Sequence, residues 1–360
     1  MKKVFVAMSG GVDSSVAAAL LKEEGHEVAG VTMCFELPEG TGHGRPRCCG
    51  LESIEDARRV AKALGIAHHV LNYGDALEEA VIRDFVAEYQ KGRTPNPCVR
   101  CNTRLKFDRL WRDVQKLGGT HLATGHYARI EQESDGWALK KGRDPRKDQS
   151  YFLHGIPRNL LSRVLFPLGG SQKDEVRGLA WRYKLPVAEK PESQDICFVP
   201  GGRYQDLLAS RGADPGRPGD FLDHTGKVVG QHRGIGHYTV GQREGLGIAL
   251  GYPAYVFLID PAENKVFVGP REHLLSGGLE ASGLNWLGAD FPKETIEADL
   301  KIRYNPFEVR GTVTFLSEGR LRVLFREPQP AVTPGQSVVL YDGDRVLGGA
   351  VIDRALIKDL

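Results

Sequence analysis

The sequence predicts an α/β protein with an N-terminal parallel sheet and two β-rich parts after it. Two observations predict this fold. Up to about residue 124, short apolar runs alternate with stretches of helical spacing, which is typical of a parallel sheet with helices on both faces. From about residue 204, glycine-rich turns separate short runs of alternating polarity, which is typical of small antiparallel sheets and barrels.

The N-terminal elements follow one another closely along the chain. Apolar runs predict strands over residues 3–8, 27–33, 68–71 and 121–124. Apolar residues at helical spacing predict helices over residues 14–24, 53–64, 75–88 and 105–116. Gly25 and Gly65 follow two of these helices, at the position where a left-handed cap is common.

Changes in composition place domain boundaries near residues 204 and 275. We therefore expect a catalytic domain over 1–204, a small central β-rich domain over 205–275, and an antiparallel β-barrel over 276–360. Runs such as EADLKIRY, FEVRGTVTFL and RLRVLFRE predict the strands of that barrel.

Overall charge does not identify a nucleic-acid-binding protein, because the formal net charge is only +2. The residues Lys140, Lys141, Arg143, Arg146 and Lys147 form a local basic stretch, which either meets RNA phosphates or is a solvated loop. The first apolar run is about five residues long, short of the roughly 7–15 of a signal peptide. No run approaches the ~18 apolar residues of a membrane span. We therefore expect a cytoplasmic protein with no membrane partner.

The loop after the first predicted strand contains the residues expected to bind a nucleotide. It reads Ser9-Gly10-Gly11-Val12-Asp13-Ser14-Ser15 and runs directly into a helix. Two adjacent glycines let the backbone approach a ligand, and the N–H groups of a helix N-terminus attract phosphate. Asp13 would repel phosphate unless a cation such as Mg2+ lies between them. No lysine follows the glycines, so this is not the kinase-type phosphate loop. The alternative is a plain strand–helix turn.

Two more residues lie where an adenine nucleotide would bind. Met33 ends the second predicted strand, and Gly125 follows the strand that ends at Thr124. Both fall on the sheet edge where open α/β sheets bind ligands. Taken alone, Met33 is better explained by packing in the core.

Six cysteines are present, and their spacing indicates metal or sulfur chemistry rather than a disulfide framework. Cys98 and Cys101 form a C-x-x-C pair that follows two prolines, and Cys197 lies far along the chain. We expect Cys101 at the start of a helix, where the helix N-terminus and basic neighbours favour its thiolate. Cys34 is expected to pack, and the adjacent Cys48 and Cys49 to lie in a loop.

The three separated thiols leave several chemistries open. In one, Cys197 carries a persulfide and Cys101 then closes a disulfide with it. In another, Cys98, Cys101 and Cys197 hold an iron–sulfur cluster of the 4Fe-4S kind, with one iron free to bind sulfide. A zinc site lacks an evident fourth ligand. Three unrelated buried cysteines are the remaining alternative.

Nine strings in order resemble the bacterial and organellar tRNA-specific 2-thiouridylases over essentially the whole chain. The strings are AMSGGVDSSVAA, CFELPEG, TPNPCVRCN, LATGHYAR, RKDQSYFL, FPLGGSQKDEVRGLA, SQDICF, GQHRGIGHYTVGQREGLGI and KIRYNP. The resemblance implies an ATP-pyrophosphatase domain of the adenine nucleotide alpha hydrolase kind at the N-terminus. It also implies ATP-dependent adenylation of O2 of a tRNA wobble uridine, replacement of that oxygen by sulfur, and release of AMP. The barrel would bind the anticodon stem-loop of tRNA, and a cysteine desulfurase or sulfur-relay protein would supply the sulfur.

The resemblance also assigns residues. Cys101 would be the nucleophile and Cys197 the persulfide carrier. The ATP site would comprise Ala7, Met8, Ser9, Gly10, Gly11, Val12, Asp13, Ser14, Met33 and Gly125. Contacts to the target base and to tRNA would come from Asn96, Pro97, Cys98, His126, Lys147, Asp148, Gln149, Arg303, Tyr304 and Gln336. Many members have aspartate where this chain has Cys98, which puts an acid–base role there in doubt and favours the cluster alternative.

Two other classes of function compete with thiolation. The S-G-G-x-D-S loop also occurs in synthetases that adenylate a small molecule, and such an enzyme would release pyrophosphate without tRNA. A non-catalytic RNA-binding or redox module would bind tRNA without turning over ATP. The widely spaced cysteines have no function in the first class, and the intact loop with Asp13 argues against the second.

Overall fold

The computed structural model describes residues 1–35, 51–192, 196–199, 204–212, 215–292 and 294–357. These residues form three sheets of five, four and eight strands. Cys48 and Cys49, which we expected in a loop, lie outside the described residues.

The N-terminal sheet is parallel, as predicted. Its strands run in the order β3-β2-β1-β4-β7, and each neighbouring pair is parallel. The strands are β1 (Lys3–Ala7), β2 (Glu27–Cys34), β3 (Ala67–Asn72), β4 (His121–Thr124) and β7 (Val164–Leu165). Strand β1 is apolar on both faces because Val4 and Val6 pack on one side and Phe5 packs on the other.

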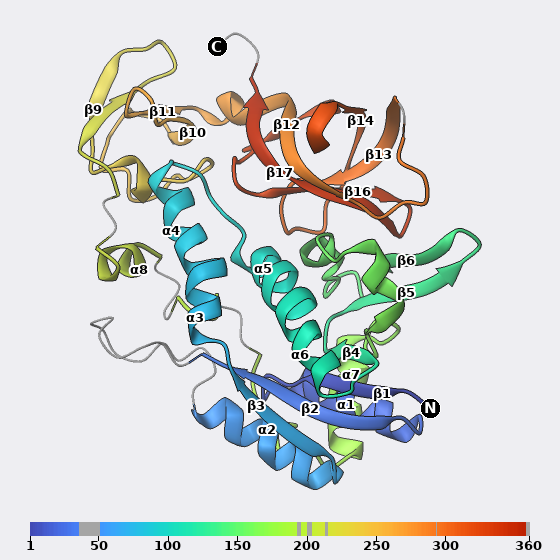
Figure 1. The fold of residues 1–360 in the computed structure, drawn as a ribbon. Helices are drawn as coiled ribbons and strands as arrows, with labels where there is room; N and C mark the ends of the chain where they lie inside the picture. Colours follow the sequence, from blue (N-terminus) through green and yellow to red (C-terminus); the bar gives the residue numbers. More distant parts are fainter. Residues whose placement is uncertain (36–50, 193–195, 200–203, 213–214, 293, 358–360) are drawn as a thin grey trace.

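Helices cover both faces of this sheet (Figure 1). On the side of Val4 and Val6 lie α1 (Val12–Glu23), α2 (Leu51–Leu64) and α7 (Lys173–Arg182). On the side of Phe5 lie α3 (Gly74–Leu77), a π-helical turn (Glu78–Ile82), α4 (Arg83–Gln90), α5 (Pro97–Arg100), a π-helical segment (Cys101–Leu110) and α6 (Trp111–Lys116). The helix predicted over 105–116 therefore begins eight residues earlier, at Pro97.

The order of the strands indicates which edge of the sheet is expected to bind a ligand. Strand β2 lies on one side of β1 and β4 on the other, so the direction of the connections reverses between β1 and β4. Ala7 at the end of β1 is in register with Val31 of β2 and Thr124 of β4. Open α/β sheets bind ligands at such a switch point, beyond the carboxyl ends of the strands.

The two following parts are β-rich, as predicted. The central part has helix α8 (Tyr204–Ser210) and strands β8 (Gly219–Leu222), β9 (Val228–His232), β10 (Tyr255–Asp260) and β11 (Lys265–Gly269). The last part has β12 (Leu275–Trp286), β13 (Thr295–Lys301), β14 (Val309–Phe315), β15 (Leu321–Pro330), β16 (Ser337–Asp342) and β17 (Arg345–Leu356). Pairing of β12 with both β15 and β17 closes these six strands into an antiparallel barrel.

A hairpin of the N-terminal part joins the barrel sheet, which the sequence did not indicate. Strands β5 (Ala128–Glu133) and β6 (Gly136–Lys141) form the hairpin, and Lys140 of β6 pairs with Arg345 of β17. Arg345 also reaches Glu133 at 2.9 Å and Asp135 at 2.7 Å. The barrel is thereby attached to the segment that directly follows β4.

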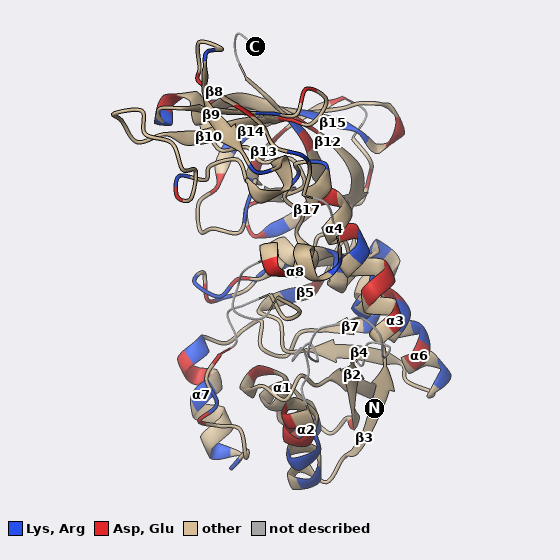
Figure 2. Ribbon diagram, turned by 90° about the vertical axis from the view of Figure 1, so that its left-hand side faces the viewer, with Lys and Arg blue, Asp and Glu red and all other residues tan. Residues whose placement is uncertain are grey.

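Within the N-terminal sheet, charged residues lie only at strand starts among the described residues, with Lys3 at the start of β1 and Glu27 at the start of β2. In Figure 2, β4 and β7 have no charged residue, whereas the surrounding helices have residues of both signs. Among the helices of the described ranges, none is long and apolar enough to cross a bilayer.

Candidate nucleotide and thiol site

The loop between β1 and α1 is closed by its own side chains. The Ser9 backbone N–H donates to Ser14 Oγ at 3.2 Å, and the hydroxyls of Ser14 and Ser15 donate to the Gly11 carbonyl at 3.3 and 2.7 Å. Gly11 is the N-cap of α1 and provides no side-chain cap. The first-turn N–H groups of α1 are therefore available for an anionic ligand.

Two glycines let three segments meet at this loop. Gly10 has φ +70°, and a Cβ there would lie 2.2 Å from the Ser53 carbonyl oxygen of α2. A Cβ at Gly125, just after β4, would lie 2.7 Å from the Ser14 nitrogen. The chain leaving β4 thus touches the first turn of α1, which is the placement predicted for Gly125.

The other residues expected at the ATP site are Ala7, Met8, Val12 and Met33, and their side chains pack in or against the core. The side chains of Met8 and Val12 are buried in the core on the α1 side of the sheet. Met33 is half-buried near the end of β2 and packs against the core on the opposite side. Met8, Val12 and Ala7 can therefore offer only backbone atoms or apolar support to a nucleotide.

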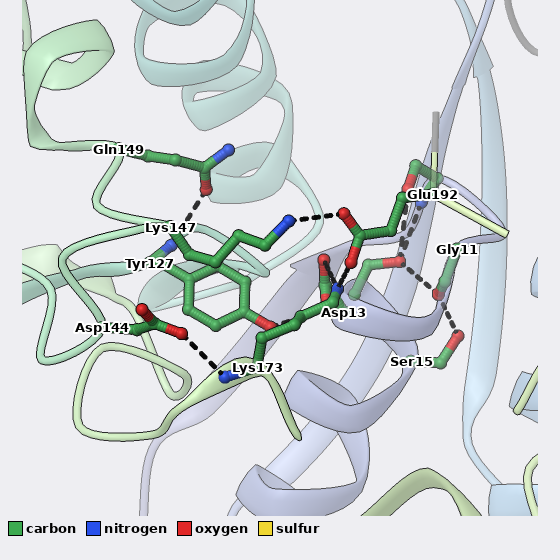
Figure 3. Close-up of polar contacts among 11 residues, drawn as sticks. Gly11, Asp13, Ser15, Tyr127, Asp144, Lys147, Gln149, Lys173 and Glu192 are labelled. Atoms are coloured by element: carbon green, nitrogen blue, oxygen red, sulfur yellow. Dashed lines mark hydrogen bonds and ion pairs between the residues drawn. The ribbon is translucent and has the colours of Figure 1, made fainter. Parts of the chain in front are cut away.

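Asp13 is held in a network of charged side chains that the sequence analysis missed (Figure 3). Lys173, the first residue of α7, reaches the two Asp13 carboxylate oxygens at 2.7 and 2.9 Å, and the Tyr127 hydroxyl donates to Asp13 at 2.9 Å. Lys173 also lies 2.9 Å from Glu192, whose other oxygen lies 2.7 Å from Lys147. Lys173 lies in the string FPLGGSQKDEVRGLA, which indicated the family but assigned no role to this lysine.

The network fixes the charges of its members. Hydrogen bonds from Lys147 and then Lys173 lower the pKa of Glu192 to about 2. Burial, reinforced by the charge of Asp13, raises the pKa of Tyr127 far above its ordinary value. At neutral pH Glu192 is therefore ionised and the Tyr127 hydroxyl is a donor.

Magnesium would have to share Asp13 with this ammonium. Among the described residues, no three His, Cys, Asp or Glu side chains form a group that could hold a metal ion. Mg2+ is usually bound by one or two carboxylates together with phosphate oxygens and water. The residues present fit a cation that arrives with the triphosphate, with Asp13 as the nearest carboxylate.

The helix that contains the C-x-x-C pair begins at Pro97. Asn96 Oδ1 accepts from the Val99 N–H at 3.3 Å, and Pro97 occupies the first helical position. Cys98 therefore lies in the first turn, and Cys101 lies one turn further along. The expectation that Cys101 starts the helix was wrong, because Asn96 is the cap and Pro97 the first residue, one turn earlier.

From Cys101 to Leu110 the helix follows a π pattern. Such segments occur frequently at functional sites. The basic neighbours of Cys101 are partly neutralised, because Arg100 and Arg104 both pair with Asp84, at 3.1 and 3.5 Å.

The Cys98 thiol lies within range of the charge of Cys197. Cys98 is exposed at the surface, yet desolvation by the protein around it raises the pKa of its thiol; the charge of Cys197 adds to the rise, and Lys106 opposes it. Cys197 is exposed, whereas Phe198 and Val199 after it are buried. The Phe198 ring packs edge-on against Phe85 at 5.5 Å, which anchors the segment.

Cys101 is half-buried against the same core that includes Phe85 and Phe198. Within the described part of the chain, the three thiols do not form a group of metal-binding geometry. The arrangement therefore does not fit an iron–sulfur cluster held by Cys98, Cys101 and Cys197.

A chain of ion pairs connects the nucleotide loop to the segment of Cys197. Asp13 binds Lys173, which binds Glu192, five residues before Cys197. On its other side, the loop lies against Gly125, which is close to the Ser14 nitrogen. Burial and then the charge of Lys106 lower the pKa of the adjacent His126, and the same charge opposes the rise in the pKa of Cys98.

Several of the N-terminal residues expected to contact tRNA are hydrogen-bonded to nearby parts of the chain. His126 bonds Thr124 through Nδ1 at 2.6 Å, and Gln149 accepts from the Tyr127 N–H at 3.0 Å. Asp148 is 5% exposed and accepts from Gly142 and Ser150, so it stabilises its own loop.

The C-terminal residues in this set lie closer to the surface. Tyr304 is 49% exposed, and its ring lies 4.4 Å from that of Phe152. Arg303 donates to the carbonyls of Pro330 and Ala331. Gln336 donates to the Thr94 carbonyl at 2.9 Å, two residues before Asn96.

The basic stretch is ion-paired throughout. Lys140 pairs with Glu131 and Glu133, Lys141 with Glu308, Arg143 with Glu175, Arg146 with Asp144, and Lys147 with Glu192. This arrangement favours the solvated-loop alternative over a row of charges awaiting phosphate.

Three family models match successive parts of the chain. Residues 2–201 match a tRNA methyl transferase HUP domain, residues 206–270 a tRNA methyl transferase PRC-barrel domain, and residues 276–352 an aminomethyltransferase β-barrel domain. Curated relatives match nearly the whole chain. A protein of Geobacter metallireducens named tRNA-specific 2-thiouridylase MnmA is 53% identical, over 99% of this chain and 98% of the relative.

Proteins of the same name from two other bacteria are similarly close. The one from Syntrophus aciditrophicus is 52% identical over 99% of this chain and 94% of its own length. The one from Carboxydothermus hydrogenoformans is 48% identical over 99% of this chain and 98% of its own length.

Proposed function

The chain belongs to the tRNA-specific 2-thiouridylase family, and from that premise we propose how its loop and its thiols act on one tRNA uridine. The enzyme is a tRNA-uridine 2-sulfurtransferase with an ATP-utilising N-terminal fold. We propose that ATP adenylates O2 of the uridine at the loop, and that sulfur then reaches C2 from the thiols. The observation that supports this proposal is the chain of ion pairs from Asp13 through Lys173 to Glu192, five residues before Cys197.

The first step forms a bond between uridine O2 and the α-phosphorus of ATP, and pyrophosphate leaves. Residues 9–14 and Gly125 would bind the triphosphate through backbone N–H groups at the N-terminus of α1. Mg2+ bound to the triphosphate would neutralise part of its charge. Lys173, held between Asp13 and Glu192, would present its ammonium to the leaving pyrophosphate.

The second step transfers sulfur. The terminal sulfur of a Cys197 persulfide attacks C2, AMP leaves with the former O2, and a disulfide joins C2 to Cys197. The Cys101 thiolate then attacks the Cys197 sulfur, which releases 2-thiouridine and forms a Cys101–Cys197 disulfide. A cellular thiol reductant restores both thiols, and a sulfane-sulfur donor such as a cysteine desulfurase or relay protein reloads Cys197.

The parts of the chain would divide between chemistry and RNA binding. Residues 1–204 would contain the reaction site, residues 205–275 would connect the parts, and the barrel over 276–360 would bind the anticodon stem-loop. Asn96, Pro97 and Cys98 would surround the extruded base, because a base must leave its stack for its C2 to be reached. Such a tRNA substrate and reduced thiols are consistent with a cytoplasmic enzyme.

The test is incubation of unmodified tRNA with ATP, Mg2+ and a sulfane-sulfur donor, followed by mass analysis of nucleosides. We expect 2-thiouridine from the wild type, and none from Cys101→Ser or Cys197→Ser. Unchanged 2-thiouridine yield from both variants would refute the relay. Pyrophosphate release that ignores tRNA but rises with a small carboxylate would instead favour a small-molecule synthetase.

An iron–sulfur cluster, which the arrangement of the three thiols does not fit, would give a different experimental result. It predicts iron and broad visible absorption in anaerobically purified protein, and loss of both in Cys98→Ser. The relay predicts neither signal.

A further inference from the structure

A pocket lies where the central part, the barrel and helix α8 meet. Its volume is about 520 Å³, within the roughly 300–1,000 Å³ typical of sites for small ligands. Its walls come from the start of α8, from residues 239–242, from Arg271 and Leu274, and from Arg303 with residues 330–331. None of these lining residues belongs to the nucleotide loop.

The lining has the chemistry of an anion site. It contains two guanidinium groups, Arg271 and Arg303, and the amides of Gln205 and Gln242, but no carboxylate. Arg303 is held in place by the Pro330 and Ala331 carbonyls, so its orientation is set before a ligand arrives. Guanidinium groups match the geometry of phosphate oxygens.

Tyr204 fixes the start of α8 as one wall of the same pocket. Its hydroxyl is buried from solvent beside the side chains of Thr239 and Gln205; burial raises its pKa, and these two side chains oppose the rise as hydrogen-bond partners. The Tyr204 ring is stacked on Tyr89, with 4.1 Å between the ring centroids. The wall is therefore rigid before a ligand arrives.

The string GHYTVGQR, to which the thiolation chemistry assigns nothing, builds one wall of this pocket. The Thr239 N–H donates to Gln242 Oε1 at 3.1 Å, and the Gln242 N–H donates back to the Thr239 carbonyl at 2.9 Å. Gly241 has φ +94° and donates to the Val256 carbonyl of β10. The turn is therefore fixed, and it presents Thr239 to the pocket.

Thr239 connects the pocket to the segment that would surround the target base. Its hydroxyl lies 3.3 Å from the Thr94 hydroxyl. The Thr94 N–H donates to the Pro334 carbonyl, and its carbonyl accepts from Gln336. Thr94 precedes Asn96 by two residues, so the pocket lies beside the predicted path of the RNA strand.

We infer that this pocket binds a backbone phosphate of the tRNA, on a nucleotide that flanks the target uridine. This inference rests on the proposed function and deepens it, by assigning the central part to the grip on the extruded strand. Enzymes that flip a base commonly contact the flanking nucleotides, and a phosphate contact fixes position without reading sequence. The pocket is therefore expected to serve any tRNA whose anticodon loop fits.

The test compares Arg271→Ala with Arg217→Ala. Both replace an exposed arginine of the central part, but only Arg271 lines the pocket. Filter binding of unmodified tRNA to the full-length variants is measured over a range of salt concentrations. We expect Arg271→Ala to weaken binding roughly tenfold and to reduce the slope of log K against log salt by about 0.7–1. Arg217→Ala should stay near the wild type in both measurements.

A second arm separates RNA phosphate from the polyphosphate of ATP. ATP binding without tRNA should be the same in the wild type and in both variants. Equal tRNA affinity and slope for the two variants would overturn the inference, and so would loss of ATP binding in Arg271→Ala. If the wild type made no 2-thiouridine while Arg271→Ala still weakened tRNA binding, the proposed function would fail and the phosphate site would stand.

Discussion

The nucleotide loop and the thiol region are linked by ion pairs through Lys173 but are built in different ways. The loop is closed by short-range bonds among Ser9, Gly11, Ser14 and Ser15, all within one strand–helix unit. The thiols come from the first two turns of a helix and from a segment about a hundred residues later along the chain. Among the described residues, the packing of Phe198 and the ion pairs of Glu192 with Lys173 and Lys147 hold that later segment in place.

This difference separates the two halves of the proposed reaction. Neighbouring backbone leaves no room for a side chain at Gly10 or Gly125, so the loop has its shape before ATP binds. Adenylation should therefore tolerate changes at the thiols. Sulfur transfer depends on the contacts that bring the Cys197 segment to the loop. Lys173 takes part in both, because it binds Asp13 of the loop and Glu192 near Cys197.

The largest expected effect is on Lys173. Replacing it by Met should lower kcat/KM for tRNA-dependent pyrophosphate release about a hundredfold, which is typical of removing one preorganised donor. Lys173→Arg should retain part of the activity. Arg177→Met removes the same charge from the same helix and should be close to the wild type. Equal rates for Lys173→Met and Arg177→Met would show that α7 provides no catalytic charge.

The rigidity of the loop can be tested at Gly10. Gly10→Ala should lower the free energy of unfolding by about 1–3 kcal/mol, because it combines a positive φ with a clash against the Ser53 carbonyl. Gly25→Ala is the matched control, since Gly25 has φ +80° but no atom within 4 Å of its Cβ position. Chemical denaturation of both variants measures the difference. Equal destabilisation would mean that the contact with Ser53 imposes no constraint.

On the thiol side, the pKa of Cys98 can be followed by alkylation against pH. Burial and the charge of Cys197 raise this pKa, so half-maximal reactivity should fall above the ordinary range of about 8–9. Cys197→Ser should move the midpoint down, and Lys106→Met should move it up. A midpoint that Cys197→Ser leaves unchanged would show that the two thiols are not neighbours in solution.

The smallest effect is expected at Glu192. Its pKa is lowered to about 2 from an ordinary value of 4.5, so its stabilising contribution is present above about pH 4.5 and is lost as the pH falls toward 2. Glu192→Gln should therefore lower the melting temperature at pH 6 and change it little near pH 2. Glu189→Gln should change it little at either pH. A pH-independent effect of Glu192→Gln would contradict the assignment.

The sequence predicted the features that depend on local pattern. The apolar runs identified the parallel sheet, and the loop at Ser9–Ser15 and Gly125 was located because strand ends share one edge. The closed barrel followed from alternating runs.

Features that depend on distant contacts were missed. Lys173 was not singled out, since its partner Asp13 is 160 residues away. Pairing of β6 with β17 was equally invisible. The helix start at Pro97 was missed because the apolar spacing begins only at Leu105, whereas Asn96 caps the helix and Pro97 occupies its first position.

The most direct measurement traps the proposed intermediate. Cys197→Ser protein is incubated with unmodified tRNA and ATP labelled at the α-phosphate, and the tRNA is recovered and examined for covalent label. The account predicts labelled AMP on the tRNA without 2-thiouridine, because the loop acts before the thiols. Pyrophosphate release with no label on the tRNA would contradict it.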